Sequence, residues 1–139
     1  MKKMPVVHFE MPAIDNKRVS QFYTNAFGWD MQQLGSEMSN YLIAGTSDTD
    51  ENRMVKTPGT INGGFFQRKD DELNRSPHVV ISVDDIEESR KAVEAAGGQI
   101  MGEKMDIPGI GFYYSFKDTE GNIVGMLQPH NRDYTAATS

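Results

Sequence analysis

Two histidines in short apolar runs are the residues of this chain best suited to do chemistry. His8 lies in the run over residues 6–11, and His78 begins the run over residues 78–83. Imidazole binds divalent transition metals and moves protons near neutral pH. Glu10 lies two residues after His8, so both side chains would point to one face of an extended strand. The three residues are therefore candidates for a site that binds a metal or an organic ligand.

The elements that would position these histidines occur twice. A shift of 70 residues superimposes five pairs of identical residues: His8 and His78, Asp15 and Asp85, Ala26 and Ala96, Gly28 and Gly98, Met31 and Met101. Self-similarity at a fixed period indicates a repeated structural unit. Each copy has the pattern of a strand, a helix and two or three further strands.

Two helices are expected, over residues 16–27 and 85–96. Apolar residues recur at helical spacing in both segments. Asp15 and Asp85 are suited to cap the first turns, and Gly28 is suited to end the first helix. The helices would lie on the outside of the sheets.

Extended segments follow each helix. They cover residues 41–44 and 61–68 in the first copy, and 111–117 and 122–128 in the second. The turn at residues 119–122 is typical of a hairpin. The polar stretch over residues 45–60 is expected to be either a mobile lid or disordered. Residues 70–76 would link the copies, and residues 130–139 would form a frayed tail.

Three stretches carry a family resemblance. They are His8 followed by Phe22-Tyr23 and residues 26–29, residues 78–85 followed by 95–98, and residues 116–122, which match the pattern F-x-D-P-x-G-N except at the proline. Together they resemble the vicinal-oxygen-chelate superfamily of glyoxalases, bleomycin-resistance proteins and extradiol dioxygenases. The resemblance covers roughly residues 5–129.

The resemblance implies an α+β fold in which two βαβββ modules form curved sheets around a pocket. Within a single glyoxalase-like domain over residues 1–139, module one would span about residues 5–69 and module two about 77–129. The superfamily usually forms dimers, and a homodimer would cover edge strands that each sheet otherwise exposes.

The metal ligands of the superfamily's enzymes are incomplete here. Those enzymes use a histidine or similar residue on each first strand and a carboxylate on a later strand. The matching position of the second module is Gly125, and that of the first is Gly63 or Gly64. His8 and His78 would remain as weak candidate ligands, because two neutral imidazoles are a poor site for a divalent ion.

A third ligand could come only from Glu10, which shares a face with His8. No cofactor is therefore expected, although a divalent metal stays possible. Histidines that merely line the pocket with hydrogen bonds are the simpler interpretation.

A pocket for an organic ligand is the remaining expectation. Its substrate-binding candidates are His8, Glu10, Phe66, His78, Phe112, Tyr114 and Gly125. Aromatic residues on strands could equally form the core, and glycine within a strand could equally mark a bulge or tight curvature.

The composition of the chain argues against several other classes of partner and site. The chain has 139 residues, 14 basic and 20 acidic, and a net charge of −6, which argues against nucleic acid and anionic membranes. It has no cysteine, so disulfides, thiolate nucleophiles and cysteine-ligated zinc are excluded. No stretch approaches the ~18 apolar residues of a membrane span. A cytoplasmic location is expected.

Three functions remain. The first is a small-molecule-binding protein of the glyoxalase or bleomycin-resistance kind, without a complete catalytic metal site. The second is a divalent-metal-dependent lyase, isomerase or dioxygenase that uses His8 and His78. The third is a binding module within an assembly or a regulatory partnership.

Overall fold

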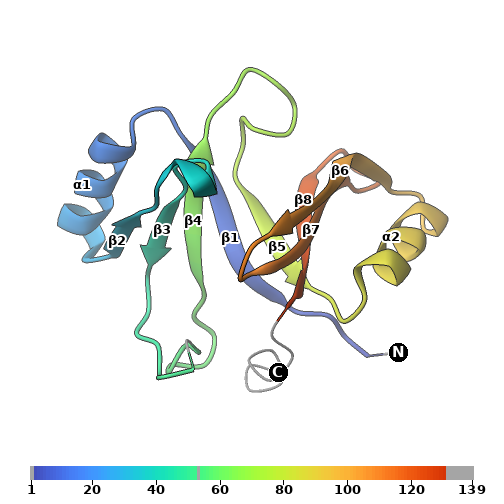
Figure 1. The fold of residues 1–139 in the computed structure, drawn as a ribbon, viewed down its shortest axis with the longest axis horizontal. Helices are drawn as coiled ribbons and strands as arrows, with labels where there is room; N and C mark the ends of the chain where they lie inside the picture. The colour runs from blue at the N-terminus through green and yellow to red at the C-terminus, as the bar shows by residue number, and fades with distance from the viewer. Residues whose placement is uncertain (1, 53, 131–139) are drawn as a thin grey trace. The chain divides into compact units, whose positions relative to one another are not determined.

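The computed structural model describes residues 2–52 and 54–130. The chain divides into two compact units, His8–Pro77 (module one) and Met1–Val7 with His78–Ser139 (module two). Each unit combines one α-helix with four strands of a curved sheet (Figure 1). The predicted α+β fold of two βαβββ modules is confirmed. Neither helix in the described part of the chain has the length and apolar character that a membrane span requires.

Module one contains a mixed sheet and a helix. Its elements are β1 (Val6–Ala13), α1 (Asn16–Phe27), β2 (Asp30–Gln33), the short 3-10 helix η1 (Ser36–Met38), β3 (Leu42–Gly45) and β4 (Asn62–Gln67). The strand order is β2-β3-β4-β1. The pair β1–β4 is parallel, and the pairs β2–β3 and β3–β4 are antiparallel.

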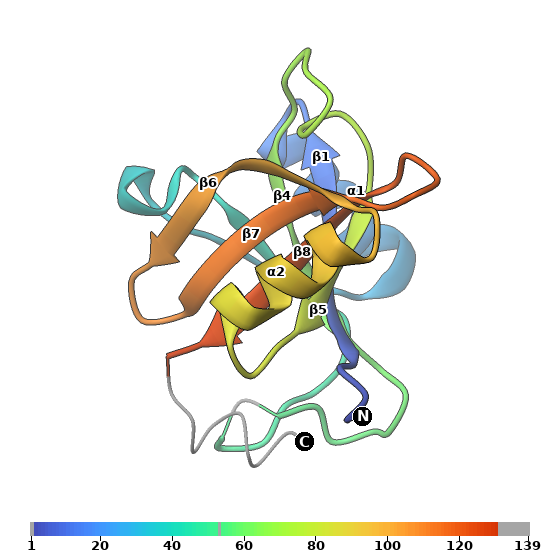
Figure 2. The same ribbon diagram turned by 90° about the vertical axis from the view of Figure 1, so that its right-hand side faces the viewer.

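Module two repeats this connectivity. Its elements are β5 (His78–Ser82), α2 (Ile86–Ala95), β6 (Gln99–Ile107), β7 (Gly111–Lys117) and β8 (Ile123–Pro129). The strand order is β5-β8-β7-β6, with β5–β8 parallel and the other pairs antiparallel. Figure 2 shows α2 lying across the sheet. Sequence reasoning gave no bounds for β6, because a register shift between Met101 and Met105 interrupts its alternation.

Both helices begin and end for local reasons that the sequence predicts. The Asp15 carboxylate accepts a hydrogen bond from the Arg18 backbone N–H at 3.0 Å, and Asp85 caps α2 in the same way. Gly28 ends α1 with φ of 72°, a left-handed conformation that glycine adopts at little cost.

The two cores set the direction of the histidines. In module one, Phe9 and Met11 pack with α1 residues on the buried cluster of Ala13, Leu42, Ala44 and Phe65. In module two, Ile81 packs on the buried cluster of Val83, Ile86, Tyr114 and Met126. Because side chains alternate along a strand, His8, Glu10 and His78 point to the face opposite the helix of their own module, as predicted.

The N-terminal residues belong structurally to module two. Pro5 accepts a backbone hydrogen bond from Ser82 at 2.9 Å, and Lys2 forms an ion pair with Asp84 at 3.0 Å. The sequence placed the start of module one at about residue 5, whereas the compact unit begins at His8.

Hydrogen bonds connect the described residues of the stretch predicted to be a lid or disordered, 45–52 and 54–60. Thr49 and Val55 form an isolated antiparallel bridge. The Asp50 carboxylate accepts from the backbone N–H of Met54 at 3.1 Å, and the Met54 side chain is buried. Of the expected tail, residues 131–139 lie outside the described residues. His130, which is described, forms a hydrogen bond with Asp106, with 2.7 Å between Nε2 and Oδ1.

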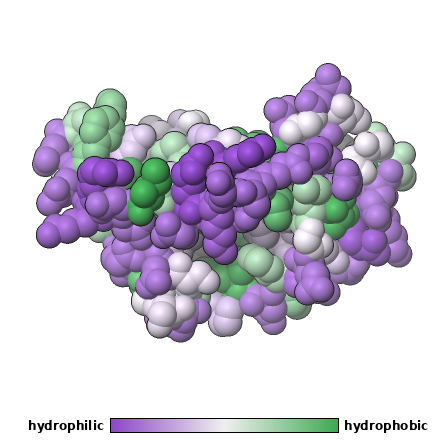
Figure 3. Space-filling view, turned by 90° about the horizontal axis from the view of Figure 1, so that it is seen from above, coloured by the Kyte–Doolittle hydropathy of each residue, from purple (hydrophilic) through white to green (hydrophobic). Residues whose placement is uncertain are grey.

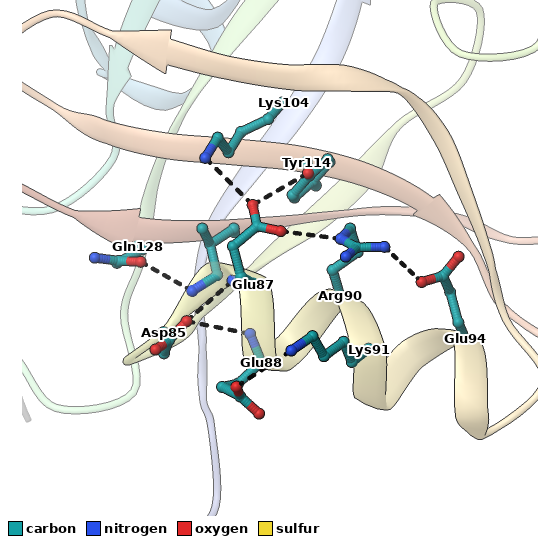
Figure 4. A network of polar contacts seen from close by, with 10 residues as sticks. Asp85, Glu87, Glu88, Arg90, Lys91, Glu94, Lys104, Tyr114 and Gln128 are labelled. Carbon is teal, nitrogen blue, oxygen red and sulfur yellow. Dashed lines mark hydrogen bonds and ion pairs between the residues drawn. The ribbon is translucent and has the colours of Figure 1, made fainter.

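A polar network holds α2 against its sheet (Figure 4). The Glu87 carboxylate accepts from Arg90 at 3.0 Å, from the Tyr114 hydroxyl at 3.2 Å and from Lys104 at 3.2 Å. Lys104 comes from β6 and Tyr114 from β7. The hydrogen bond from Arg90, helped by Lys104 and Tyr114, lowers the pKa of Glu87.

Glu87→Gln is therefore expected to lower the melting temperature at neutral pH. A carboxylate whose pKa is lower in the folded than in the unfolded state stabilises the fold above its unfolded pKa, and this stabilisation is lost as the pH falls. The difference in melting temperature between wild type and Glu87→Gln should become smaller below about pH 4.3, the usual pKa of glutamate. Thermal melts over this range measure it. Glu88→Gln, at an exposed residue of the same helical turn, is the control, and an equal pH-dependent gap there would contradict the assignment.

Candidate functional site

Three polar side chains meet on the face of module one opposite α1. The Tyr41 hydroxyl lies 3.2 Å from Nε2 of His8 and donates a hydrogen bond to Oε2 of Glu10 at 3.0 Å. His8 and Glu10 come from β1, and Tyr41 immediately precedes β3. All three side chains are half-buried. We call these residues the His8–Tyr41–Glu10 cluster.

Gly64 makes room for Tyr41. Glu10 is the register partner of Gly64 on β4. A Cβ atom at Gly64 would overlap the Tyr41 ring and hydroxyl, so any larger residue would displace the tyrosine. Of the two glycines that the sequence offered for the missing carboxylate, Gly64 is the one on the His8 face. A Cβ at Gly63 would instead meet the ring of Phe9, on the α1 side.

Module two repeats the arrangement with one difference. The Tyr113 hydroxyl lies 3.4 Å from Nε2 of His78, and a Cβ at Gly125 would overlap that hydroxyl. Val80 pairs with Gly125 as Glu10 pairs with Gly64. The two modules therefore share a histidine, a tyrosine and a glycine in equivalent places, and Val80 of module two holds the position that Glu10 holds in module one.

The register makes the two tyrosines equivalent. Ile43 lies opposite Gly64, and Ser115 lies opposite Gly125. Tyr41 and Tyr113 each precede that residue by two positions, so both rings lean over the glycine of the neighbouring strand. The strand glycines were expected to leave space that a ligand or a facing backbone could approach. In both modules a tyrosine fills this space.

Not all predicted site residues share the histidine faces. Phe66 follows the buried core residue Phe65, so it points to the same face as His8. The expectation for Phe112 and Tyr114 is not met. Phe112 packs on the core cluster of α2, and the Tyr114 hydroxyl donates to Glu87 on that helix. Both therefore lie on the face of module two opposite His78.

Sequence reasoning missed Tyr41 as a site residue and did not select Tyr113. Tyr41 lies at the edge of its expected strand, where alternation gives little guidance. Tyr113 stands among Phe112, Tyr114 and Phe116, so aromatic character did not distinguish the two faces of β7. The signal that could have found both is the strand glycine, which leaves space for one large neighbour.

Neither module by itself brings together three histidine or carboxylate donors among its described residues. Catalytic zinc sites use three protein ligands, each about 2.0–2.3 Å from the ion. In module one a neutral phenol lies between His8 and Glu10, so an ion bound to both would have to displace Tyr41. In module two, Val80 stands where a carboxylate would be needed. Within either module, the described residues form no group of three histidine, cysteine, aspartate or glutamate side chains that could hold a metal.

A shallow groove lies elsewhere on module one. Its volume is about 460 Å³, and it is lined by Pro12, Ala13, Ile14, Asp15, Arg18, Val19, Phe22 and Arg68. Ile14 and Phe22 are exposed, and Figure 3 shows apolar side chains among polar ones on the side of α1. The groove contains none of the predicted site residues.

The chain is a small αβ protein built from duplicated βαβββ modules. Each module has a histidine on its first strand that faces away from the helix. The family model of the Glyoxalase/Bleomycin resistance protein/Dioxygenase superfamily matches residues 6–126. The chain belongs to this superfamily.

Relatives agree with this assignment. A glyoxylase-like domain-containing protein of Didymella fabae is 28% identical over 116 residues, which cover 81% of this chain and 84% of that protein. CFP32 of Mycobacterium tuberculosis, whose name marks it as a candidate glyoxylase, is 38% identical over 77 residues. That match covers 55% of this chain and 30% of CFP32, so the chain spans less than a third of that protein.

Solved structures share the fold at low identity. A methylmalonyl-CoA epimerase of Streptomyces coelicolor, in complex with 2-nitronate-propionyl-CoA, has a TM-score of 0.67 and 11% identity, covering 94% of this chain and 100% of that chain. A superfamily member from Vibrio splendidus has a TM-score of 0.57 and 14% identity, covering 91% and 99%. At these identities the likeness concerns the fold alone.

Proposed function

We propose that this protein binds a small organic molecule on the histidine–tyrosine faces of its modules, without a complete catalytic metal site. One observation carries the proposal. In both modules a tyrosine fills the space beside the glycine at the superfamily's carboxylate position and reaches the first-strand histidine. A hydroxyl that donates and accepts hydrogen bonds is suited to an oxygen-bearing organic ligand.

The neighbouring side chains agree with such a ligand. Phe66 offers a flat apolar surface on the same face as the His8–Tyr41–Glu10 cluster. Ligand sites in proteins commonly combine apolar and aromatic walls with a few polar groups that orient the ligand. Phe112 and Tyr114 are left out of the proposed site because they pack with α2.

Metal titration tests the proposal. Calorimetry with Zn²⁺ and with Ni²⁺ should show no tight, stoichiometric binding that depends on His8, because neither module supplies three ligands. His8→Ala is the test variant. His130→Ala is the matched control, since His130 and Asp106 form a surface pair that could bind a metal weakly. Tight binding that His8→Ala abolishes and His130→Ala retains would contradict the proposal.

That contrary result would favour the second candidate, a divalent-metal-dependent lyase, isomerase or dioxygenase using His8 and His78. Their equivalent positions on β1 and β5 favour it. In that case Glu10 would be the third ligand, after displacement of Tyr41. We also propose a homodimer that covers the sheet edges, on the basis of the family resemblance, and a cytoplasmic location, on the basis of the lack of cysteine.

A further inference from the structure

Tyr41 lies between a group that can give a proton and a group that can take one. We propose that the His8–Tyr41–Glu10 cluster is a proton relay, which gives module one an acid–base activity toward its ligand. The inference deepens the proposed function by assigning chemistry to the binding face. It concerns the three side chains themselves, so it can be tested without the ligand.

The geometry supports a continuous hydrogen-bonded path. The two contacts of the Tyr41 hydroxyl, 3.2 Å to Nε2 of His8 and 3.0 Å to Oε2 of Glu10, are within reach of hydrogen bonding. A phenol has one proton to donate and lone pairs to accept. Since Tyr41 donates to Glu10, it must accept from His8, which requires a proton on Nε2 of that histidine.

The proton transfer balances within the three residues. When His8 is an imidazolium and Glu10 a carboxylate, the Nε2–H bond of His8 breaks as a new O–H bond forms on Tyr41. The original hydroxyl bond of Tyr41 breaks as an O–H bond forms on Oε2 of Glu10. His8 ends neutral, Glu10 ends as a carboxylic acid and Tyr41 is regenerated. The summed charge is unchanged, and the reverse transfer uses the same atoms.

This arrangement suits an organic molecule with a carbonyl or hydroxyl oxygen. Such a molecule can give a proton to Nδ1 of neutral His8 while the Nε2–H proton passes through Tyr41 to Glu10, whose carboxylic acid can then return a proton to the molecule. His8 is left as the Nδ1–H tautomer, which exchange with solvent returns to the Nε2–H form. Positioned acids and bases of this kind are common catalysts of proton transfer.

Module two provides an internal comparison. His78 and Tyr113 repeat the first contact at 3.4 Å, but Val80 replaces the proton acceptor. Strand alternation also places Asp30 of β2 on the His8 face of module one, three strand spacings from β1, or roughly 14 Å.

A double-mutant cycle read by NMR tests the relay. The imidazole signals of His8 give its pKa in wild type, Glu10→Gln, Tyr41→Phe and the double variant. In the protein that keeps Tyr41, Glu10→Gln should lower the pKa of His8 by about 1 unit, because a nearby carboxylate favours the imidazolium. With phenylalanine at position 41 the same change should lower it by less than half as much.

Two controls keep this result specific. Tyr23→Phe changes a tyrosine that packs on the α1 side, and Glu37→Gln removes an equal charge from the exposed η1. Neither should change the pKa of His8. Tyr41→Phe keeps the ring over Gly64, and unchanged amide spectra would show that its fold is retained.

The tautomer of neutral His8 is the second readout. Imidazole ¹⁵N shifts should show the Nε2–H form in wild type and a mixture of tautomers in Tyr41→Phe. The relay would be overturned if Glu10→Gln lowered the pKa of His8 equally with tyrosine and with phenylalanine at position 41. It would also be overturned if neutral His8 of the wild-type protein were the Nδ1–H tautomer. Neither result would bear on whether the face binds an organic ligand, which a thermal-shift comparison of wild type with Phe66→Ala addresses separately.

Discussion

Gly125→Glu, which places the superfamily's carboxylate back on the final strand, should destabilise the protein by about 3 kcal/mol rather than create a metal site. Gly125 is buried on β8, and a Cβ there overlaps the Tyr113 hydroxyl. Tyr113 is itself only 9% exposed, so its ring has little room to move. The new carboxylate would also be removed from water at this buried position.

Removing the tyrosine should reverse part of this loss. Tyr113→Ala with Gly125→Glu should be more stable than the sum of the single changes predicts, because the two side chains compete for one space. Urea unfolding of the four proteins measures this coupling. Gly125→Gln is the matched control that separates size from charge. Additive effects, or wild-type stability of Gly125→Glu, would show that Tyr113 does not occupy the carboxylate's place.

Phe65→Ala and Phe66→Ala should destabilise the protein to different extents although the residues are neighbours. Phe65 is 2% exposed and packs in the core with Leu42 and Tyr23, so its truncation should cost about 3–5 kcal/mol of unfolding free energy. Phe66 lies on the His8 face and is half-buried. Its truncation should cost less than half as much.

Denaturant unfolding measures the loss of stability in both variants. A thermal-shift screen of aromatic acids and ketones measures whether Phe66 contributes to ligand binding. Any compound that stabilises wild type should stabilise Phe66→Ala less, if Phe66 contacts the ligand. The pair serves as its own control, since both variants remove the same atoms from adjacent positions of β4. Equal losses of stability would contradict the assignment of the two faces.

The sequence by itself was enough to predict the duplicated modules and the helices. Asp15, Asp85 and Gly28 act through hydrogen bonds and backbone conformations that span a few residues, so they can be read without the rest of the fold. The directions of His8 and His78 were also predictable. On β1 and β5 the residues that pack with the helix alternate with the histidines, so a period of two assigns the faces.

Only the tertiary structure decided which tyrosine belongs to the site. On β7, aromatic residues point to both faces, and a shift of one position exchanges the faces of all of them. The pairing with β8 and the packing of α2 place Tyr114 with the helix and Tyr113 with His78. The His8–Tyr41–Glu10 cluster joins residues 31 and 33 positions apart through the register of neighbouring strands. Such contacts depend on which glycine lies beside each ring in the folded sheet. The order of residue types along the chain does not specify which side chains become neighbours in this way.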